Sequence, residues 1–212
     1  MIPFARMLEY GNEIKENVVL DIDFSRQSVG DTHIIDWSMN STFNLAVGTT
    51  AGIVEYNSGI GTNVMKFNNS RYITAMNEYL SLVGETFEIS LVLNSANNPV
   101  GEIFCTGDYN GSRIPGMNLS NNPANTAYQM FMDNGIAFST VLFGPSTNNA
   151  WDRVTYKVQD VTSINTTVNG NKQTFTFRPY GNGTSFSIAS SYTGGTPVFW
   201  NGYLQKLKIV KL

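Results

Sequence analysis

The sequence predicts an all-β protein built as a two-sheet antiparallel β-sandwich. Three observations lead to this prediction: apolar residues recur at every second position in many short runs, Asn-Gly pairs separate these runs, and no segment carries a sustained helical stripe. Period-two alternation places one face of a strand on a core and the other in solvent, which is typical of antiparallel sheets.

The alternating runs predict strands in order along the chain. Between Val18 and Phe24 the even positions are apolar and are expected to face the core, whereas Asp21 and Asp23 are expected to face solvent. The run from Phe87 to Leu93 is the clearest, with an apolar residue at every odd position. Further alternating runs occupy residues 154–158, 174–177, 185–188 and 206–209.

Asparagine and glycine mark the connections between these runs, since 25 of the 212 residues are Asn. Asn tolerates positive φ and, followed by Gly, suits tight hairpin turns. A short helix is expected around Thr74 to Leu82, and residues 97–150 are expected to hold the candidate loops. The Asn-Gly pairs predicted as turns are Asn110-Gly111, Asn134-Gly135, Asn169-Gly170, Asn182-Gly183 and Asn201-Gly202.

The domain organisation follows from the absence of repeats and linker-like stretches. Residues 18–212 are predicted to form a single sandwich domain. Residues 1–17 stand apart as a mildly amphipathic N-terminal arm or attachment segment, which either packs on a sheet or docks on another protein.

Composition excludes several classes of function. A hydrophobic fraction of 42% with 12% aromatic residues is enough to form a core, while only 14% of residues are charged. The net charge of −3 and pI near 5.1 argue against a nucleic-acid groove. No stretch has the roughly 18 apolar residues of a membrane span. The start, from Met1, lacks the pattern of a secretory signal, so synthesis in a host cytoplasm and release by a route such as lysis are expected.

Five motifs, in this order, resemble those of laminin G-like and concanavalin A-like domains, and they extend from about residue 18 to the end. The resemblance implies a jelly-roll sandwich and places Trp37, Trp151 and Trp200 at core positions. The Glu-x-Asp-x-x-Glu triplet of the laminarinase-like members is absent. The motifs are Leu20–Phe24 with Asp36-Trp-Ser-Met-Asn40 (similar to D-x-S-G-N), Met65–Ile73, Phe87–Leu93, Trp151–Tyr156 with Val168-Asn-Gly170, and Phe199–Leu204.

Low charge, abundant Asn, a start without a secretory signal and a short arm also resemble proteins of tailed-bacteriophage particles. This resemblance implies a location in the virion, in the head or the tail. It also implies contacts with other virion proteins through residues 1–17. Assembly as a homo-oligomer is left open.

Enzymatic chemistry is disfavoured by the residues present. Asp21 and Asp23 are the only strand pair with the spacing of two same-face carboxylates for glycoside hydrolysis, and a solvated strand face explains them better. The single histidine, His33, has no nucleophile elbow beside it, and Cys105 lies in an apolar strand. The chain is therefore predicted not to be an enzyme.

Calcium is the one cofactor that the sequence leaves open. Many laminin G-like domains bind it at a rim through carboxylates, and hard oxygen ligands are available. The alternative is that these aspartates cap turns. The candidate ligands are Asp31, Asp36, Asp108 and Asp133.

Carbohydrate binding needs an aromatic face for sugar C–H groups beside groups that bond hydroxyls. The segment 108–113 offers acid, ring, amide and base in Asp108, Tyr109, Asn110 and Arg113. Tyr180 with Asn182, and Tyr192, are further candidates, although all three tyrosines are also typical of ordinary turns. The predicted function is a non-catalytic recognition module that binds a cell-surface glycan. The alternatives are a purely structural decoration protein and, less favoured, a glycoside-processing enzyme.

Overall fold

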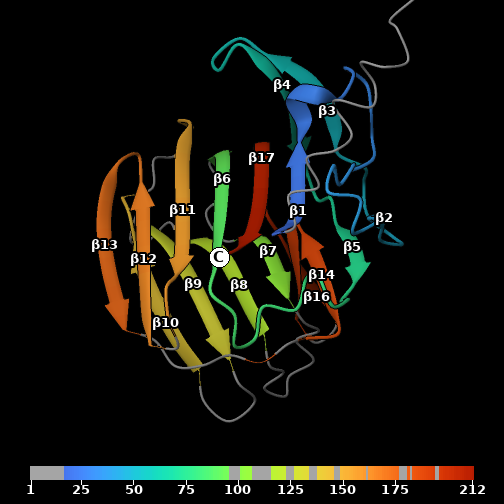
Figure 1. Ribbon diagram of the computed structural model, residues 1–212. Helices are drawn as coiled ribbons and strands as arrows, with labels where there is room; N and C mark the ends of the chain where they lie inside the picture. The colour runs from blue at the N-terminus through green and yellow to red at the C-terminus, as the bar shows by residue number, and fades with distance from the viewer. Residues whose placement is uncertain are drawn as a thin grey trace, which may run out of the picture.

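Two antiparallel sheets face each other across a shared apolar core in the computed structural model (Figure 1). The predicted all-β sandwich is confirmed. The structure describes residues 17–95, 101–106, 116–122, 127–133, 138–145, 149–160, 162–176, 181, 183–193 and 196–212. Among them, no helix has the length and apolar character needed to cross a membrane.

Sheet A is eight-stranded, and β17 is its longest strand. In spatial order it contains β13 (Asn171–Thr176), β12 (Ser163–Val168), β11 (Asp152–Val158), β6 (Phe87–Ser95), β17 (Gly202–Lys211), β4 (Thr62–Phe67) and β3 (Ile53–Asn57). The first strand, β1 (Val18–Asp23), also pairs with β17 and leads into a 3-10 turn, η1 (Phe24–Arg26).

Sheet B is nine-stranded and forms the second layer. In spatial order it contains β10 (Phe138–Phe143), β9 (Ala127–Asp133), β8 (Gly116–Asn122), β7 (Gly101–Thr106), β14 (Ser185–Ile188), β5 (Tyr72–Ala75) and β2 (Asn44–Leu45). Two short strands, β15 (Ser190–Thr193) and β16 (Thr196–Phe199), pair with each other, and β16 also pairs in parallel with β7.

The core lies where the predicted alternation places it. In β6 the residues from Phe87 to Leu93 at odd positions are at most 2% exposed, and their even neighbours are half-buried. Leu207 and Ile209 of β17 are fully buried on the same side. Cys105 is buried as expected. Trp200, just before β17, is also fully buried and contacts Phe67 with ring centroids 5.8 Å apart.

Three predictions about local structure are wrong. Residues 97–150 were expected to hold the candidate loops; the strand expected at Cys105 is present as β7, but the same stretch also supplies β8, β9 and β10, whose backbones pair with one another in sequence. The expected helix at 74–82 is instead the end of β5 followed by a turn. Val19 is buried and Val18 is half-buried, because the register of β1 against β17 shifts between residues 18 and 20 and reverses the alternation there.

Two of the predicted Asn-Gly turns lie within the described residues, and one of them is confirmed while the other is wrong. Asn169 and Gly170 have φ values of +49° and +88° and join β12 to β13 as a two-residue hairpin loop. Gly202, by contrast, begins β17 rather than a turn. Its lack of a side chain is needed there because the indole of Trp200 lies against it. The pairs beginning at Asn110, Asn134 and Asn182 lie outside the described residues.

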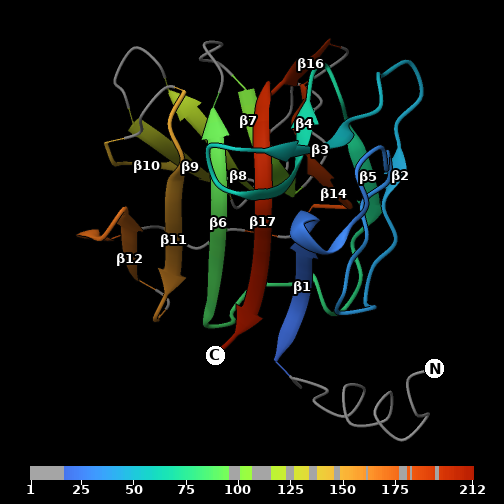
Figure 2. The ribbon, with the colours of Figure 1, turned by 90° about the horizontal axis from the view of Figure 1, so that it is seen from above.

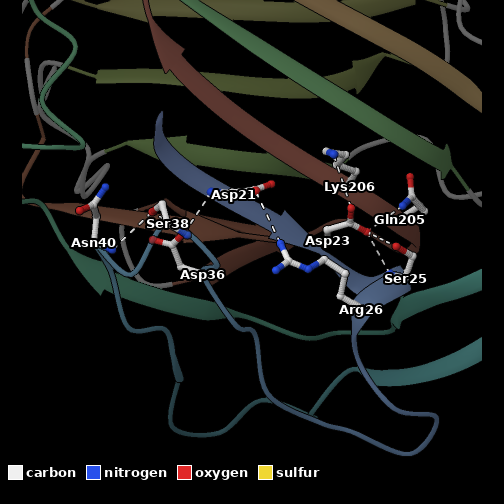
Figure 3. Close-up of polar contacts among 9 residues, drawn as sticks. All are labelled: Asp21, Asp23, Ser25, Arg26, Asp36, Ser38, Asn40, Gln205 and Lys206. Carbon is white, nitrogen blue, oxygen red and sulfur yellow. Dashed lines mark hydrogen bonds and ion pairs between the residues drawn. The ribbon is translucent and has the colours of Figure 1, made fainter. Parts of the chain in front are cut away.

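A short loop covers the free edge of β1 (Figure 3). Asp36 accepts a hydrogen bond from the Asp21 amide at 2.9 Å, and the Trp37 amide donates to the Asp21 carbonyl at 2.7 Å. Ser38 Oγ and Asn40 Nδ2 donate to the carbonyls of Val19 and Val18. The 36–40 motif thus supplies the bonds that a neighbouring strand would make and blocks pairing with other chains.

A buried polar group ties the two sheets together. Tyr128 of β9 in sheet B donates its phenol hydrogen to Asp152 of β11 in sheet A at 2.7 Å, and Asn169 Nδ2 donates to the same carboxylate at 2.6 Å. Tyr128 and Asp152 are both fully buried. Burial raises the pKa of the Tyr128 phenol, and the Asp152 carboxylate raises it further, so the phenol remains a donor.

Removing this donor has a measurable cost. The substitution Tyr128→Phe leaves a buried carboxylate without one of its donors, which costs about 1.5–3 kcal/mol for a hydrogen bond to a charged group. Urea denaturation followed by circular dichroism measures the loss. Tyr56→Phe is the control, because that side chain is 61% exposed and the change is expected to cost less than about 0.5 kcal/mol. Equal stabilities of the two variants would contradict this account of the sheet contact.

Candidate functional site

Most of the predicted ligand-binding residues lie outside the part of the chain that the structure describes. This applies to Asp108, Tyr109, Asn110 and Arg113, and to Tyr180 and Asn182. Tyr192 is placed only by its backbone, in β15 opposite Pro197.

The backbone around Tyr192 lies in the β15–β16 hairpin beside β7, where Phe199 pairs with Glu102. Phe186 near the start of β14 pairs with Thr106 at the other end of β7. A grouping of Tyr192 with the other candidates stays a prediction.

Two of the predicted calcium ligands, Asp31 and Asp36, accept hydrogen bonds within turns. Asp36 accepts from the amides of Asp21, Ser38 and Ser41 as well as from Ser38 Oγ. Asp31 accepts from the Ser28 amide at 3.0 Å. Asp133 ends β9, and only its backbone is described. Within the described residues, no three His, Cys, Asp or Glu side chains are grouped as a metal ion would require.

The two strand carboxylates of β1 face outward, as predicted, and are held by neighbours (Figure 3). Asp23 accepts from Ser25 and from Gln205 Nε2 at 2.9 Å, and forms an ion pair with Lys206 at 3.4 Å. Asp21 forms an ion pair with Arg26 at 3.8 Å. Both carboxylates thus make polar contacts that stabilise the edge of β1.

A more promising arrangement lies on the outer face of sheet A. The register places Tyr203 of β17 between Lys66 of β4 and Asn94 of β6. Trp151 directly precedes Asp152, which pairs with Leu93, so Trp151 follows the outward alternation and lies across from Asn94. We call these four side chains the aromatic row: Lys66, Tyr203, Asn94 and Trp151.

The two rings of the aromatic row lean toward each other. The ring centroids of Trp151 and Tyr203 are 6.5 Å apart at an interplanar angle of 45°, within the range of favourable aromatic pairs. Lys66 is exposed, and its Nζ lies 5.8 Å from the centroid of the Tyr203 ring. Trp151, Tyr203 and Asn94 are half-buried, so each retains surface that a ligand can contact.

The β3–β4 hairpin forms a wall beside the aromatic row. Figure 2 shows this hairpin passing across the outer face of β6 and β17. A Cβ placed on Gly59 at its tip would lie 3.6 Å from Trp151 Nε1, so the tip rests against the indole. The tip is held by Asn57, whose side chain accepts from the Gly59 amide at 2.9 Å. The Asn94 amide, the Lys66 ammonium group and the rings of the aromatic row therefore lie side by side on a surface that the hairpin partly covers.

Sequence reasoning missed this site because it assigned all three tryptophans to the core. Trp200 is buried as expected, but Trp37 is only half-buried, with the Arg26 guanidinium 4.0 Å above its ring. Trp151 points outward. The sequence did contain a signal for this orientation. In residues 154–158 the inward side chains occupy even positions, and the same alternation continued back to residue 151 predicts that Trp151 faces outward.

Comparison with known proteins extends the description of the fold. No protein-family model and no curated protein matches the sequence. Solved structures do match: the binding domain of Paraclostridial Mosquitocidal Protein 1 has a TM-score of 0.68, with 15% identity over 94% of this chain and 50% of that one. The receptor binding domain of botulinum neurotoxin D has a TM-score of 0.65, with 13% identity over 94% of this chain and 51% of that one.

A third similar structure contains a ligand. The binding domain of botulinum neurotoxin DC in complex with SialylT has a TM-score of 0.62, with 15% identity over 94% of this chain and 50% of that one. At these identities the likeness establishes the shared fold. The chain spans about half the length of these toxin domains, each of which is described as a binding domain.

Proposed function

We propose that this protein is a non-catalytic recognition module that binds a glycan through the aromatic row. The observation that carries the proposal is the register that aligns Trp151, Tyr203, Asn94 and Lys66 on one outer face. Rings contact the C–H faces of a sugar, while an amide and an ammonium group bond its hydroxyls. Most small-ligand sites combine an apolar surface with a few placed polar groups in this way.

Two further observations support a binding role over a catalytic one. Asp23, one member of the only predicted same-face carboxylate pair, has both oxygens engaged by Ser25, Gln205 and Lys206. The similar solved structures are binding domains of toxins, one of them in complex with SialylT. Because the chain matches only half of each toxin domain, the support is for the class of function and not for the position of that ligand.

The proposal includes a place on a virus particle. Its support is compositional: the chain has 14% charged residues and 25 Asn, and it resembles tailed-bacteriophage proteins in these respects. Residues 1–17 would attach the sandwich to other virion proteins, leaving the aromatic row free to contact a cell surface. Mass spectrometry of purified particles tests this part of the proposal: detection of the chain supports it, and absence from particles contradicts it.

A purely structural decoration role is the second candidate, and exposed apolar side chains favour it. Gly30 donates to the Val54 carbonyl, which brings the 28–31 loop beside β3 at the edge of sheet A. Such apolar exposure is typical of surfaces that contact another protein subunit. The exposed apolar side chains at this edge are Val29 and Ile53, and Leu45 is exposed on β2, the edge strand of sheet B. Sedimentation of the isolated chain, with and without the Ile53→Ser change, tests for self-association.

A glycan-array screen of the purified chain, run with calcium and with chelator, tests the proposed function. We expect specific binding that the Lys66→Gln variant weakens severalfold, because Lys66 is exposed at the end of the row. Loss of binding in chelator would support calcium ligation, for which Asp31, Asp36, Asp108 and Asp133 remain our candidates. A folded sample that binds no glycan would contradict the proposal and favour the decoration role.

A further inference from the structure

Cationic side chains extend from the aromatic row across the outer face of sheet A. In the next row, Val92 of β6 pairs with both Lys206 of β17 and Arg153 of β11, so two cations flank an apolar residue. One row further, the register joins Lys208, Ser90, Thr155, Thr167 and Lys172 across five strands. Lys157 lies one row beyond, on β11. We call Arg153, Lys157, Lys172, Lys206 and Lys208 the cationic face.

Few opposing charges lie within this surface. Glu88 is the one acidic residue among the described outward positions of β6, β11, β12, β13 and β17; it pairs in register with Lys157 and accepts from Ser90 Oγ at 3.2 Å. Asp21 and Asp23 lie at the β1 margin, where Asp23 holds Lys206. The whole chain has a net charge of −3, whereas this face carries five cations and a single acidic residue at its described outward positions, so its local charge is positive.

The dimensions of the cationic face favour an extended ligand. Lys172 on β13 and Lys208 on β17 are four strand steps apart, which corresponds to about 19 Å at the usual spacing of paired strands. A single sugar at the aromatic row cannot reach both. Between them the row presents the hydroxyl side chains of Ser90, Thr155 and Thr167, which suit the hydroxyl groups of a sugar polymer.

We propose that the ligand is an acidic polysaccharide, carboxylated or sulfated, which runs from the aromatic row across the cationic face. This inference rests on the proposed glycan recognition and specifies its ligand class. The rings hold the sugar faces, and Arg153 bonds an acidic group with the fork geometry of a guanidinium. We favour a polysaccharide over a nucleic acid because the hydroxyl side chains between the cations match the hydroxyl groups of a sugar polymer.

Calorimetric titration of the full chain with oligogalacturonate, and with a neutral malto-oligosaccharide of matched length, tests this inference. We expect oligogalacturonate to bind at least about tenfold more tightly at low salt and to lose this advantage as NaCl rises from about 50 to about 300 mM. The double variant Arg153→Gln/Lys208→Gln is expected to bind about tenfold more weakly, because two cations of the face are removed. The control is Lys211→Gln, which removes a cation paired with Glu85 outside the cationic face.

The outcomes separate this inference from the proposed function. Neutral and acidic oligosaccharides bound equally, without salt dependence, would overturn the acidic ligand and leave glycan recognition standing. No binding of either sugar, and none of a heparin oligosaccharide, would overturn both. Tighter binding of oligo(dT) than of either acidic sugar would also overturn the inference and assign the face to a nucleic acid. A loss of binding free energy per removed charge that is the same in the double variant and in the Lys211→Gln control would show that net charge, not this face, determines binding, and would overturn the inference.

Discussion

The substitution Gly202→Ala is expected to destabilise the fold strongly. A Cβ at this position would lie 2.5 Å from Trp200 Cζ2 and 2.6 Å from the backbone oxygen of Asn94. Neither atom can move cheaply, because Trp200 is fully buried and Asn94 belongs to the paired strand β6. Overpacking a core typically costs about 1–3 kcal/mol; here one of the clashes is with backbone, so we expect a loss above about 3 kcal/mol.

Gly84→Ala is the matched control for this prediction. Gly84 has a φ of +76° with no atom within 4 Å of the added Cβ, so the change costs only the left-handed backbone strain of about 1–2 kcal/mol. Guanidinium denaturation followed by circular dichroism compares the two. If Gly202→Ala folds with the stability of Gly84→Ala, the close approach of Trp200 to β17 is incorrect.

The substitution Trp151→Ala is expected to remove most of the glycan affinity. Trp is among the residues that most often dominate a binding surface, where its truncation costs about 2 kcal/mol or more, corresponding to about thirtyfold in affinity. Trp151 also supports the β3–β4 hairpin tip at Gly59, so the variant loses both the ring and part of the wall. Titration with the strongest ligand from the array measures the change in Kd.

Two variants distinguish a lost contact from a general loss of structure. Tyr79→Ala removes another exposed aromatic ring, on the turn held by Asn77, and should leave the affinity within about twofold. Trp151→Phe retains a ring under the hairpin and should restore part of the affinity. An unchanged affinity in Trp151→Ala, with an unchanged melting temperature, would remove Trp151 from the site.

The sequence was most informative where a strand's structure depends on its own residues. The inward residues of β6 and β17 follow from local alternation, as Phe87 and Ile209 illustrate. The reversal of the inward and outward directions at Val19 could not be predicted from the local sequence. It depends on a register shift against β17, which lies nearly two hundred positions away along the chain. The segment Gly116–Asn122 was missed because Gly and Asn are depleted in strands, and pairing with β7 and β9 on both sides overrides that preference.

The candidate site was harder to predict for the same reason. Its residues come from β4, β6, β17 and the residue before β11, and only the pairing of these strands brings them into one row. The position of Lys66 depends on the pairing of β4 with β17, which no local pattern encodes. Trp151 is the one residue of the row whose direction could have been predicted, because the alternation of the strand that follows it indicates that it faces outward.

The most direct test of the central claim is a two-dimensional ¹H–¹⁵N spectrum of the indole groups during titration with the strongest array ligand. The chain has three tryptophans, so three indole signals are expected. Trp200 is buried and Trp37 lies beneath Arg26, so glycan binding at the aromatic row should shift the Trp151 signal, assigned by its loss in Trp151→Phe, and leave the other two nearly unchanged. Saturable binding that leaves the Trp151 signal in place would contradict the assignment of glycan recognition to this row.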